Sequence, residues 1–273
     1  MKAVLSRKLE TSTSRNRRQG TYTHGLEYPV HVSPLRAQFD IKLIKISLFH
    51  PLDIWIFKVD ANYHEIIAEM LVNGMFLRRA DFCGTCYSDV SILPMHKRKG
   101  NLFLKKIKPQ IAADHIRRYL GLSQALREFR SSRLLTEINV PCPMPILAAT
   151  NISPLGVYES LFLCRFISGY VNCSDFLANH HNQATRRILL YSVAKDLALI
   201  HSNGLFHKDS HFGNILCNPQ KTSQIYWVDN DVKKMGNRFK VYEKIALRHF
   251  QQCEYISQSE WEFFVNCYRK NLT

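Results

Sequence analysis

Three oxygen-bearing side chains in the second half of the chain have the types and spacing of a metal-assisted reaction centre. Asp209 lies in the polar stretch HKDSHFGN, Asn214 follows it in the same stretch, and Asp229 ends the apolar run IYWVD. A carboxylate can orient a hydroxyl group and accept its proton, whereas carboxylate and amide oxygens are ligands that Mg²⁺ prefers. We therefore predict Asp209 as the catalytic base, and Asn214 and Asp229 as Mg²⁺ ligands. This combination suits phosphoryl transfer, which needs positioning and charge neutralisation more than covalent help from the protein.

A long helix and two short strands are predicted to hold the polar stretch in place. Apolar side chains recur at spacings of three and four residues over 183–203, which is typical of a helix with one buried face. They are Leu190, Val193, Leu197 and Ile200. The Asn203-Gly204 pair ends this helix. One strand begins at Ile215 and another ends at Asp229, so we expect the three side chains to converge on one point.

The preceding part of the chain predicts strands, then a helix, then strands again. The segments GMFLRRADF, YSDVSIL and NLFLKKIK have the composition of strands, and their connections hold Gly84 and Gly100. A helix is predicted over 125–138, and the proline-rich NVPCPMP ends it. The apolar residues expected on one face of this helix are Leu126, Phe129, Leu134 and Ile138. Another strand is predicted over 159–167.

These patterns predict an α+β protein with a small β-rich lobe, a reduced helical lobe and a cleft between them. A chain of 273 residues is long enough for two such lobes. We expect a mobile basic tail over 1–38 and an N-terminal extension without an assigned role over 39–72, with a helix at 64–71. The β-rich lobe is expected over 73–168 and the helical lobe over 169–273.

The polar stretch resembles the catalytic loop of enzymes with the protein-kinase-like fold. His207, Asp209 and Asn214 match the pattern His-x-Asp-x-x-x-x-Asn, and Asp229 matches the metal-binding aspartate that follows an apolar strand. The wording HKDSHFGNIL is most similar to the Kdo/heptose kinases of the lipopolysaccharide inner core. The resemblance covers about 76–231. It implies ATP and Mg²⁺ as cofactors, and a Kdo or heptose hydroxyl of a lipid-linked core oligosaccharide as the acceptor.

The resemblance extends upstream to residues that bind ATP. NLFLKKIKP is similar to the strand that carries the ATP-binding lysine, and Lys105 is preferred to Lys106. REFRSSRLLTEI is similar to the helix that carries the lysine's glutamate partner, for which Glu128 is preferred to Glu137. Gly84 has the place of the glycine-rich loop over the nucleotide.

Three departures from the protein-kinase pattern bear on the function. No complete Gly-x-Gly-x-x-Gly precedes Lys105. The usual Asp-Phe-Gly is replaced by Asp229-Asn230-Asp231, which lacks the glycine hinge of a switching activation segment. The stretch after Asp231 is shorter than the large substrate lobe of a protein kinase for Ser, Thr or Tyr, so we expect a compact acceptor.

Other interpretations of these residues stay open. Asp209 and Asn214 are also common turn residues, and Glu128 could be a solvated helix residue. We expect His207 to be a buried residue that shapes the loop, whereas His211 could either orient the loop or approach the acceptor. The rival functions are a kinase of another small molecule or of a protein Ser/Thr, and a nucleotide-binding pseudokinase that acts as a binding module.

The net charge and the cysteine spacing indicate which classes of ligand and partner the chain can bind. The chain has 37 Lys and Arg against 22 Asp and Glu, a net charge of +15, which favours nucleotide phosphates or an anionic membrane surface. No basic–aromatic motif indicates a specific nucleic-acid partner. Cys83 and Cys86 are an isolated pair, whereas structural zinc takes four ligands. We expect a cytoplasmic protein, with the basic tail and the apolar segment 41–59 assisting peripheral binding to the cytoplasmic face of the inner membrane.

Overall fold

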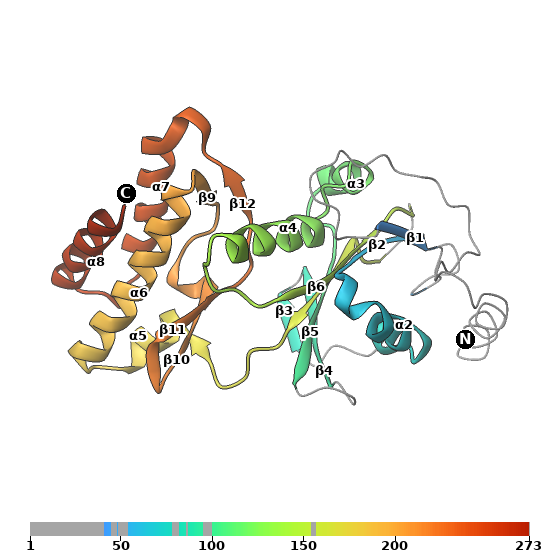
Figure 1. Cartoon of the computed structure of the whole chain (residues 1–273), viewed down its shortest axis with the longest axis horizontal. Coiled ribbons are helices and arrows are strands. Elements are labelled where there is room, and N and C mark those ends of the chain that lie inside the picture. Colours follow the sequence, from blue (N-terminus) through green and yellow to red (C-terminus); the bar gives the residue numbers. More distant parts are fainter. Residues whose placement is uncertain are drawn as a thin grey trace. The chain divides into compact units, whose positions relative to one another are not determined.

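The computed structural model describes residues 41–44, 48, 54–77, 82–85, 87–94, 100–153 and 157–272. The predicted tail over 1–38 lies outside these residues. The chain divides into two compact units (Figure 1). The first takes the described residues up to Leu126 together with Pro145–Phe166, and the second takes Arg127–Met144 together with the described residues from Ile167 onward. The lobe boundaries predicted after residues 72 and 168 stay predictions.

A seven-stranded sheet in the order β1-β2-β6-β7-β5-β4-β3 forms the first unit, and all neighbouring strands are antiparallel. Its strands are β1 (Ile41–Ile44), β2 (Trp55–Val59), β3 (Phe82–Thr85), β4 (Ser88–Pro94), β5 (Asn101–Ile107), β6 (Pro145–Asn151) and β7 (Ser160–Arg165). Strand β5, which carries the two lysines considered for ATP binding, lies inside the sheet between β4 and β7. Its backbone is therefore held on both sides.

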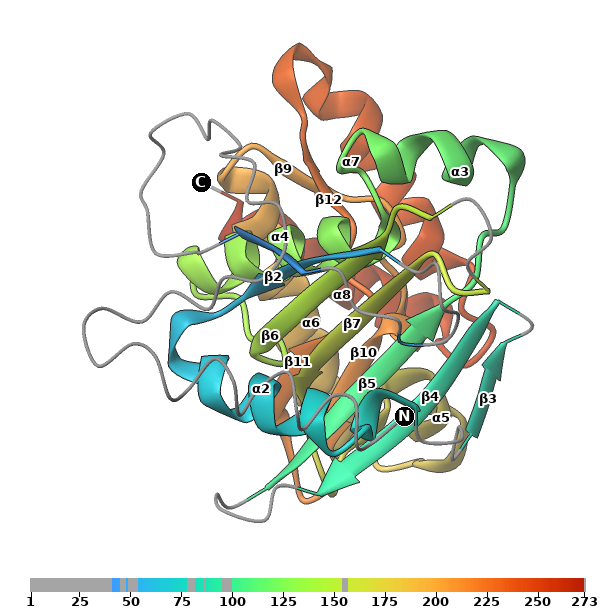
Figure 2. The same ribbon diagram turned by 90° about the vertical axis from the view of Figure 1, so that its right-hand side faces the viewer.

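Helix α2 (His64–Val72) covers one face of this sheet (Figure 2). Its buried residues Ile67, Met70 and Leu71 pack in one cluster with Trp55, Phe57 and side chains of β4 to β7. The helix predicted at 64–71 is thus confirmed. The extension over 39–72 contributes β1, β2 and α2, so the described part of it belongs to the sheet and its core.

Two expectations for the first half of the chain were wrong in detail. Met75–Leu77, expected as part of a strand, form the 3-10 helix η2, and β3 begins only at Phe82. Helix α4 (Gln124–Glu137) matches the predicted helix, but Leu134 is 36% exposed while Leu135 is fully buried. The buried side of α4 also carries Glu128, Ser131 and Ser132. Because the prediction used apolar residues only, it could not find a face that is partly polar.

The second unit is built around α6 (Gln183–Ser202), on which all four predicted stripe residues are fully buried. This unit also holds α4 from Arg127 onward, and the helices α5 (Cys173–Asn179), α7 (Phe239–Gln251) and α8 (Gln258–Asn271). A three-stranded sheet has the order β11-β10-β8, with β8 (Val171–Asn172), β10 (Ile215–Asn218) and β11 (Lys221–Trp227). Strand β9 (Leu205–His207) pairs with β12 (Val232–Lys234). In the part of the chain that the structure describes, no helix is long and apolar enough to cross a membrane.

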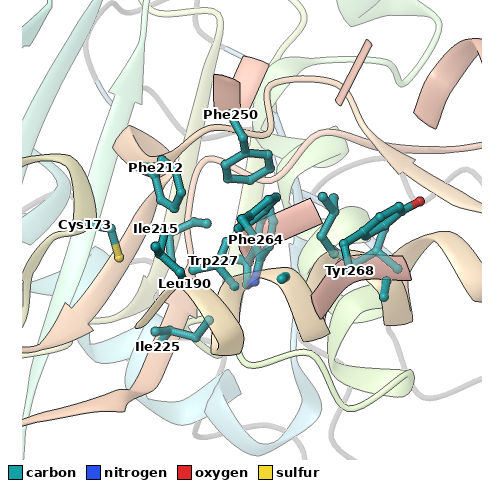
Figure 3. Close-up of a cluster of buried hydrophobic side chains, with 14 of the residues drawn as sticks. Cys173, Leu190, Phe212, Ile215, Ile225, Trp227, Phe250, Phe264 and Tyr268 are labelled. Carbon is teal, nitrogen blue, oxygen red and sulfur yellow. The ribbon is translucent and has the colours of Figure 1, made fainter. Parts of the chain in front are cut away.

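Phe212, which belongs to the polar stretch, lies in a buried aromatic cluster of this unit (Figure 3). The ring of Phe212 meets Phe250 edge-on with centroids 4.9 Å apart, and Phe250 lies 5.2 Å from Phe264. Phe212 is 1% exposed and lies in the sequence between Asp209 and Asn214. Burial of this ring therefore anchors the middle of the polar stretch in the core.

Two carboxylates complete the packing of the second unit, the buried Glu260 and the half-buried Asp196. Glu260 accepts hydrogen bonds from Arg186 at 2.6 and 3.0 Å, and this guanidinium lowers the pKa of Glu260 to about 2. Asp196 accepts a hydrogen bond from Trp227 Nε1 at 3.2 Å, but burial dominates and raises the pKa of Asp196 to about 6. The first carboxylate is stabilised in its ionised form, and the second is not.

Candidate active site

Asp209 lies in the loop between β9 and the 3-10 helix η3 (Phe212–Asn214). The side-chain amide of Asn214 donates to the Asp209 backbone oxygen and to Asp209 Oδ2, both at 2.9 Å. Asn214 is itself 9% exposed and is followed directly by β10. The start of this strand therefore fixes both the backbone and the carboxylate of Asp209.

His211 holds the other carboxylate oxygen of Asp209. Its Nε2 lies 3.4 Å from Asp209 Oδ1, and its Nδ1 accepts a hydrogen bond from the backbone N–H of Gly213 at 3.0 Å. Because Nδ1 is an acceptor, the hydrogen-bond network assigns the proton of a neutral imidazole to Nε2, which faces the carboxylate. The sequence left the role of His211 open, and the geometry favours orientation of Asp209.

These contacts keep Asp209 ionised. The imidazole of His211, 3.4 Å from Asp209 Oδ1, is the main cause that lowers the pKa of Asp209 to about 2, with Asn214 adding to it and partial burial opposing it. The carboxylate nevertheless remains exposed. A carboxylate that is exposed, oriented and ionised at neutral pH can orient an incoming hydroxyl and accept its proton.

Asn214 and Asp229 lie on neighbouring strand ends. Ile215 pairs with Trp227, and the backbone N–H of Val228 donates to the backbone oxygen of Asn214 at 2.9 Å. Asp229 follows at once with a φ of 53°, a left-handed conformation that Asp tolerates better than most residues and that often marks a functional position.

The donor set fits a magnesium ion shared with nucleotide phosphates. Both donor contacts of the Asn214 amide go to Asp209, so its Oδ1 remains as the acceptor that could bind a cation. Mg²⁺ commonly takes one or two protein oxygens and completes its shell with phosphates and water. Among the described residues, no three His, Cys, Asp or Glu side chains are grouped to hold a metal by themselves.

The residues after Asp229 are tied to α4 and to the loop. Asn230 donates to Ser132 Oγ at 3.0 Å, and its Oδ1 lies 3.1 Å from His207 Nε2. Asp231 forms ion pairs with Arg127 at 2.6 Å and with Lys208 at 2.7 Å. His207 is fully buried, which lowers its pKa and suits the structural role expected for it.

Strand geometry separates Lys105 from Lys106. Successive side chains of β5 point to opposite faces of the sheet. Leu102 and Leu104 pack in the cluster under α2, so Lys106 lies on that face, where its Nζ is 5.9 Å from the centre of the Tyr158 ring. Lys105 points to the opposite face and is 8% exposed. This arrangement supports Lys105 as the residue for ATP.

Two further candidates for ATP binding are Glu128 and Gly84. Glu128 is 6% exposed on the buried side of α4, whereas its alternative Glu137 is exposed in the last turn of this helix. This difference supports Glu128. Gly84 lies in the edge strand β3, where the pairing with β4 shifts between Cys83 and Thr85. Its contact with a nucleotide stays a prediction.

Several residues near the site were not predicted from the sequence. Arg127, Ser131 and Ser132 are polar residues of α4, and the apolar spacing that predicts this helix gives no signal for them. Asp231 offered a signal, since a charged residue in the place of the usual glycine needs a partner. The pairing of His211 with Asp209 had no signal beyond their spacing.

Comparisons with known proteins identify a family and a fold. The model of the lipopolysaccharide kinase (Kdo/WaaP) family matches residues 77–268. The chain is similar to a solved structure of WaaP in complex with acyl carrier protein, with 14% identity, a TM-score of 0.53, and coverage of 71% of this chain and 79% of that one. It also matches Rad53 residues 1–466 in complex with AMP-PNP, with 15% identity, a TM-score of 0.45, and coverage of 80% of this chain and 62% of that one. No curated protein matches the chain.

The family match spans most of the chain and includes α4, the polar loop and the strand end with Asp229. The likeness to WaaP confirms the protein-kinase-like fold predicted from the sequence, with a β-rich part before a helical part. The chain therefore belongs to the lipopolysaccharide kinase (Kdo/WaaP) family, and it is a phosphotransferase whose acceptor is a hydroxyl group.

Proposed function

We propose that this kinase uses ATP and Mg²⁺ to phosphorylate a Kdo or heptose hydroxyl of the lipopolysaccharide inner core. The observation that supports it most is the ionised Asp209 held by His211 and Asn214, within the loop that the family model matches. The lipid-linked core oligosaccharide is the acceptor that the family implies.

In the proposed reaction Asp209 orients the sugar hydroxyl and takes its proton as the oxygen attacks. Lys105 and Glu128 are the residues proposed for the nucleotide, Lys105 for its phosphates, and Asn214 and Asp229 are those proposed for the metal. When bound, ATP supplies the phosphoryl group and Mg²⁺ neutralises the charge that develops during transfer. His211 and Asn214 keep the carboxylate of Asp209 aligned.

The test is phosphate transfer from ATP to purified core lipopolysaccharide, both intact and deacylated, with wild type and Asp209→Ala. We expect labelled phosphate on the sugar and a loss of about 10²- to 10⁴-fold in the variant, as for removal of a general base. ATP binding should be retained, because Asp209 is assigned to the acceptor. Transfer to neither form of the acceptor, with ATP still bound, would assign the enzyme to another small molecule or a protein Ser/Thr.

Peripheral binding to an anionic, cytoplasmic membrane face is the second part of the proposal. The net charge of +15 supports it. The apolar segment 41–59 is a poor anchor, because Trp55, Phe57 and Val59 are buried in the core of the first unit. An exposed alternative is α3 (Ala112–Tyr119), which was not predicted from the sequence.

Helix α3 and the residue after it expose Ile116, Tyr119 and Leu120, which are 65%, 55% and 67% exposed at helical spacing beside Arg117. This combination suits an interfacial helix. Sedimentation with phosphatidylglycerol vesicles at low and high salt tests the idea. We expect salt-sensitive binding that weakens in Ile116→Ser/Leu120→Ser but not in the matched exposed pair Val241→Ser/Ile245→Ser. Equal binding of both double variants and wild type would refute a role for α3.

A further inference from the structure

The segment after the metal-binding aspartate makes an unusually polar connection to α4. Three successive residues each contact α4: Asn230 donates to Ser132 Oγ at 3.0 Å, Asp231 pairs with Arg127 at 2.6 Å, and the backbone N–H of Val232 donates to Ser131 Oγ at 2.8 Å. We call these contacts the 230–232 clamp.

The clamp is also fixed on its other side. Lys208, next to Asp209, pairs with Asp231 Oδ1 at 2.7 Å, and its backbone N–H donates to the Asp231 backbone oxygen at 2.9 Å. Asn230 is 2% exposed, and it contacts the fully buried His207 and the backbone oxygen of Trp227. Charged hydrogen bonds and a buried, satisfied amide make this a stiff connection, since opening it would leave buried groups without partners.

The clamped side of α4 is the side that carries Glu128. At 3.6 residues per turn, Glu128 lies one turn before Ser131 and Ser132 and between them around the helix axis. All three side chains are buried. The clamp therefore fixes Glu128 relative to Asp229 and Asn214, which belong to the same unit.

Protein kinases are commonly switched by moving these two parts. The helix with the glutamate and the segment with the metal-binding aspartate must both be in place, and activation controls this. In this chain Asn230 and Asp231 take the places of the usual Phe and Gly after the metal-binding aspartate. Both side chains bond to α4, whereas a glycine would give the backbone more conformational freedom.

We propose that Asn230 and Asp231 are positioning residues that lock α4 to the metal-binding segment, so that the kinase centre is held in its working arrangement without an activation step. The effect of this lock on activity rests on the proposed role of Glu128. The lock itself is a property of α4 that can be measured without any acceptor.

The experiment compares wild type with Asp231→Asn and Ser132→Ala, alone and combined, and with Glu254→Gln as a matched loss of an exposed charge in the same unit. Hydrogen exchange reports opening of α4, and α6 serves as the internal reference. Steady-state kinetics give kcat and the KM for ATP. Asp231→Glu tests rescue by a conservative change.

We expect the backbone amides of α4 to exchange at least about tenfold faster in the double variant. Each lost contact to a charged or buried group should raise the equilibrium constant for local opening by roughly this factor or more. Exchange in α6 should stay unchanged, kcat should fall by a similar factor, and Asp231→Glu should restore part of both. Unchanged exchange in α4, or equal acceleration in α6, would overturn the lock. Faster exchange in α4 with wild-type kcat would overturn the positioning role. If wild type phosphorylates no core acceptor, the exchange result still decides on the lock.

Discussion

Substitution of Gly213 by Ala should disable Asp209 without touching it. A Cβ at Gly213 would lie 2.6 Å from His211 Cε1 and 2.7 Å from His211 Nδ1, which is closer than real contacts allow. Gly213 is not among the glycines with positive φ, so its backbone accepts Ala. The imidazole therefore has to leave, and it loses its bonds to the Gly213 N–H and to Asp209.

The size of the effect follows from the lost contact to Asp209. A well-formed hydrogen bond to a charged group is worth about 1.5–3 kcal/mol. The contact between His211 and Asp209 is longer, at 3.4 Å, so we expect the lower end of this range, which is roughly a tenfold loss in kcat/KM. The pKa of Asp209 should also rise from about 2 toward 3.8, because His211 is the main cause of its lowering. Activity requires the ionised form, so the acid limb of the pH profile moves to higher pH. At neutral pH the carboxylate stays ionised in both proteins, and the loss there reports orientation alone.

A double-mutant cycle isolates this mechanism. Initial rates of phosphate transfer to deacylated core oligosaccharide are measured for Gly213→Ala, His211→Ala and the double variant across the acid range. If Ala acts by displacing the ring, Gly213→Ala has little further effect once His211 is removed. Wild-type activity of Gly213→Ala, or the same fold-loss in both backgrounds, would refute the reasoning.

Three further predictions concern single side chains. Lys105→Met should raise the KM for ATP and lower kcat/KM by at least about tenfold. Lys106→Met changes the opposite face of the sheet and should leave the ATP kinetics nearly unchanged. Equal losses of the two variants in steady-state assays would contradict the assignment of Lys105. Glu260→Gln should cost about 3–5 kcal/mol of unfolding free energy at neutral pH, because Arg186 is left buried without its counter-charge. Since the pKa of Glu260 is depressed to about 2, wild type should lose this stability as pH falls below about 4.5 toward 2, and urea melts of the variant should lack that slope. Partial burial raises the pKa of Asp196 to about 6, so its ionisation destabilises the fold as pH rises through that value. Asp196→Asn should therefore raise the thermal midpoint of unfolding at neutral pH but not near about pH 4. No gain at neutral pH would argue against an unfavourable charge at this half-buried position.

The sequence by itself determined the elements with strong local signals. The helix over α6 follows from apolar spacing, and its four predicted residues are all fully buried. The motif around Asp209, Asn214 and Asp229 indicated both the family and the kinase-like fold, because phosphoryl transfer restricts the residue types that can hold a metal and a hydroxyl. Strands β4 and β5, helix α4 and strand β7 were predicted in the right order, but α3, which lies between β5 and α4, was not predicted.

Only the tertiary structure decided which polar residues work together. The sequence preferred Lys105 to Lys106 and Glu128 to Glu137 by resemblance alone. The structure adds physical support for both preferences, through the sheet face that α2 covers and the buried side of α4. That side could not be found from apolar periodicity, since Ser131 and Ser132 are buried by bonding to a segment some hundred residues away along the chain. Local patterns report what each residue prefers, whereas polar partners far apart in sequence are assigned by the fold that brings them within hydrogen-bonding distance.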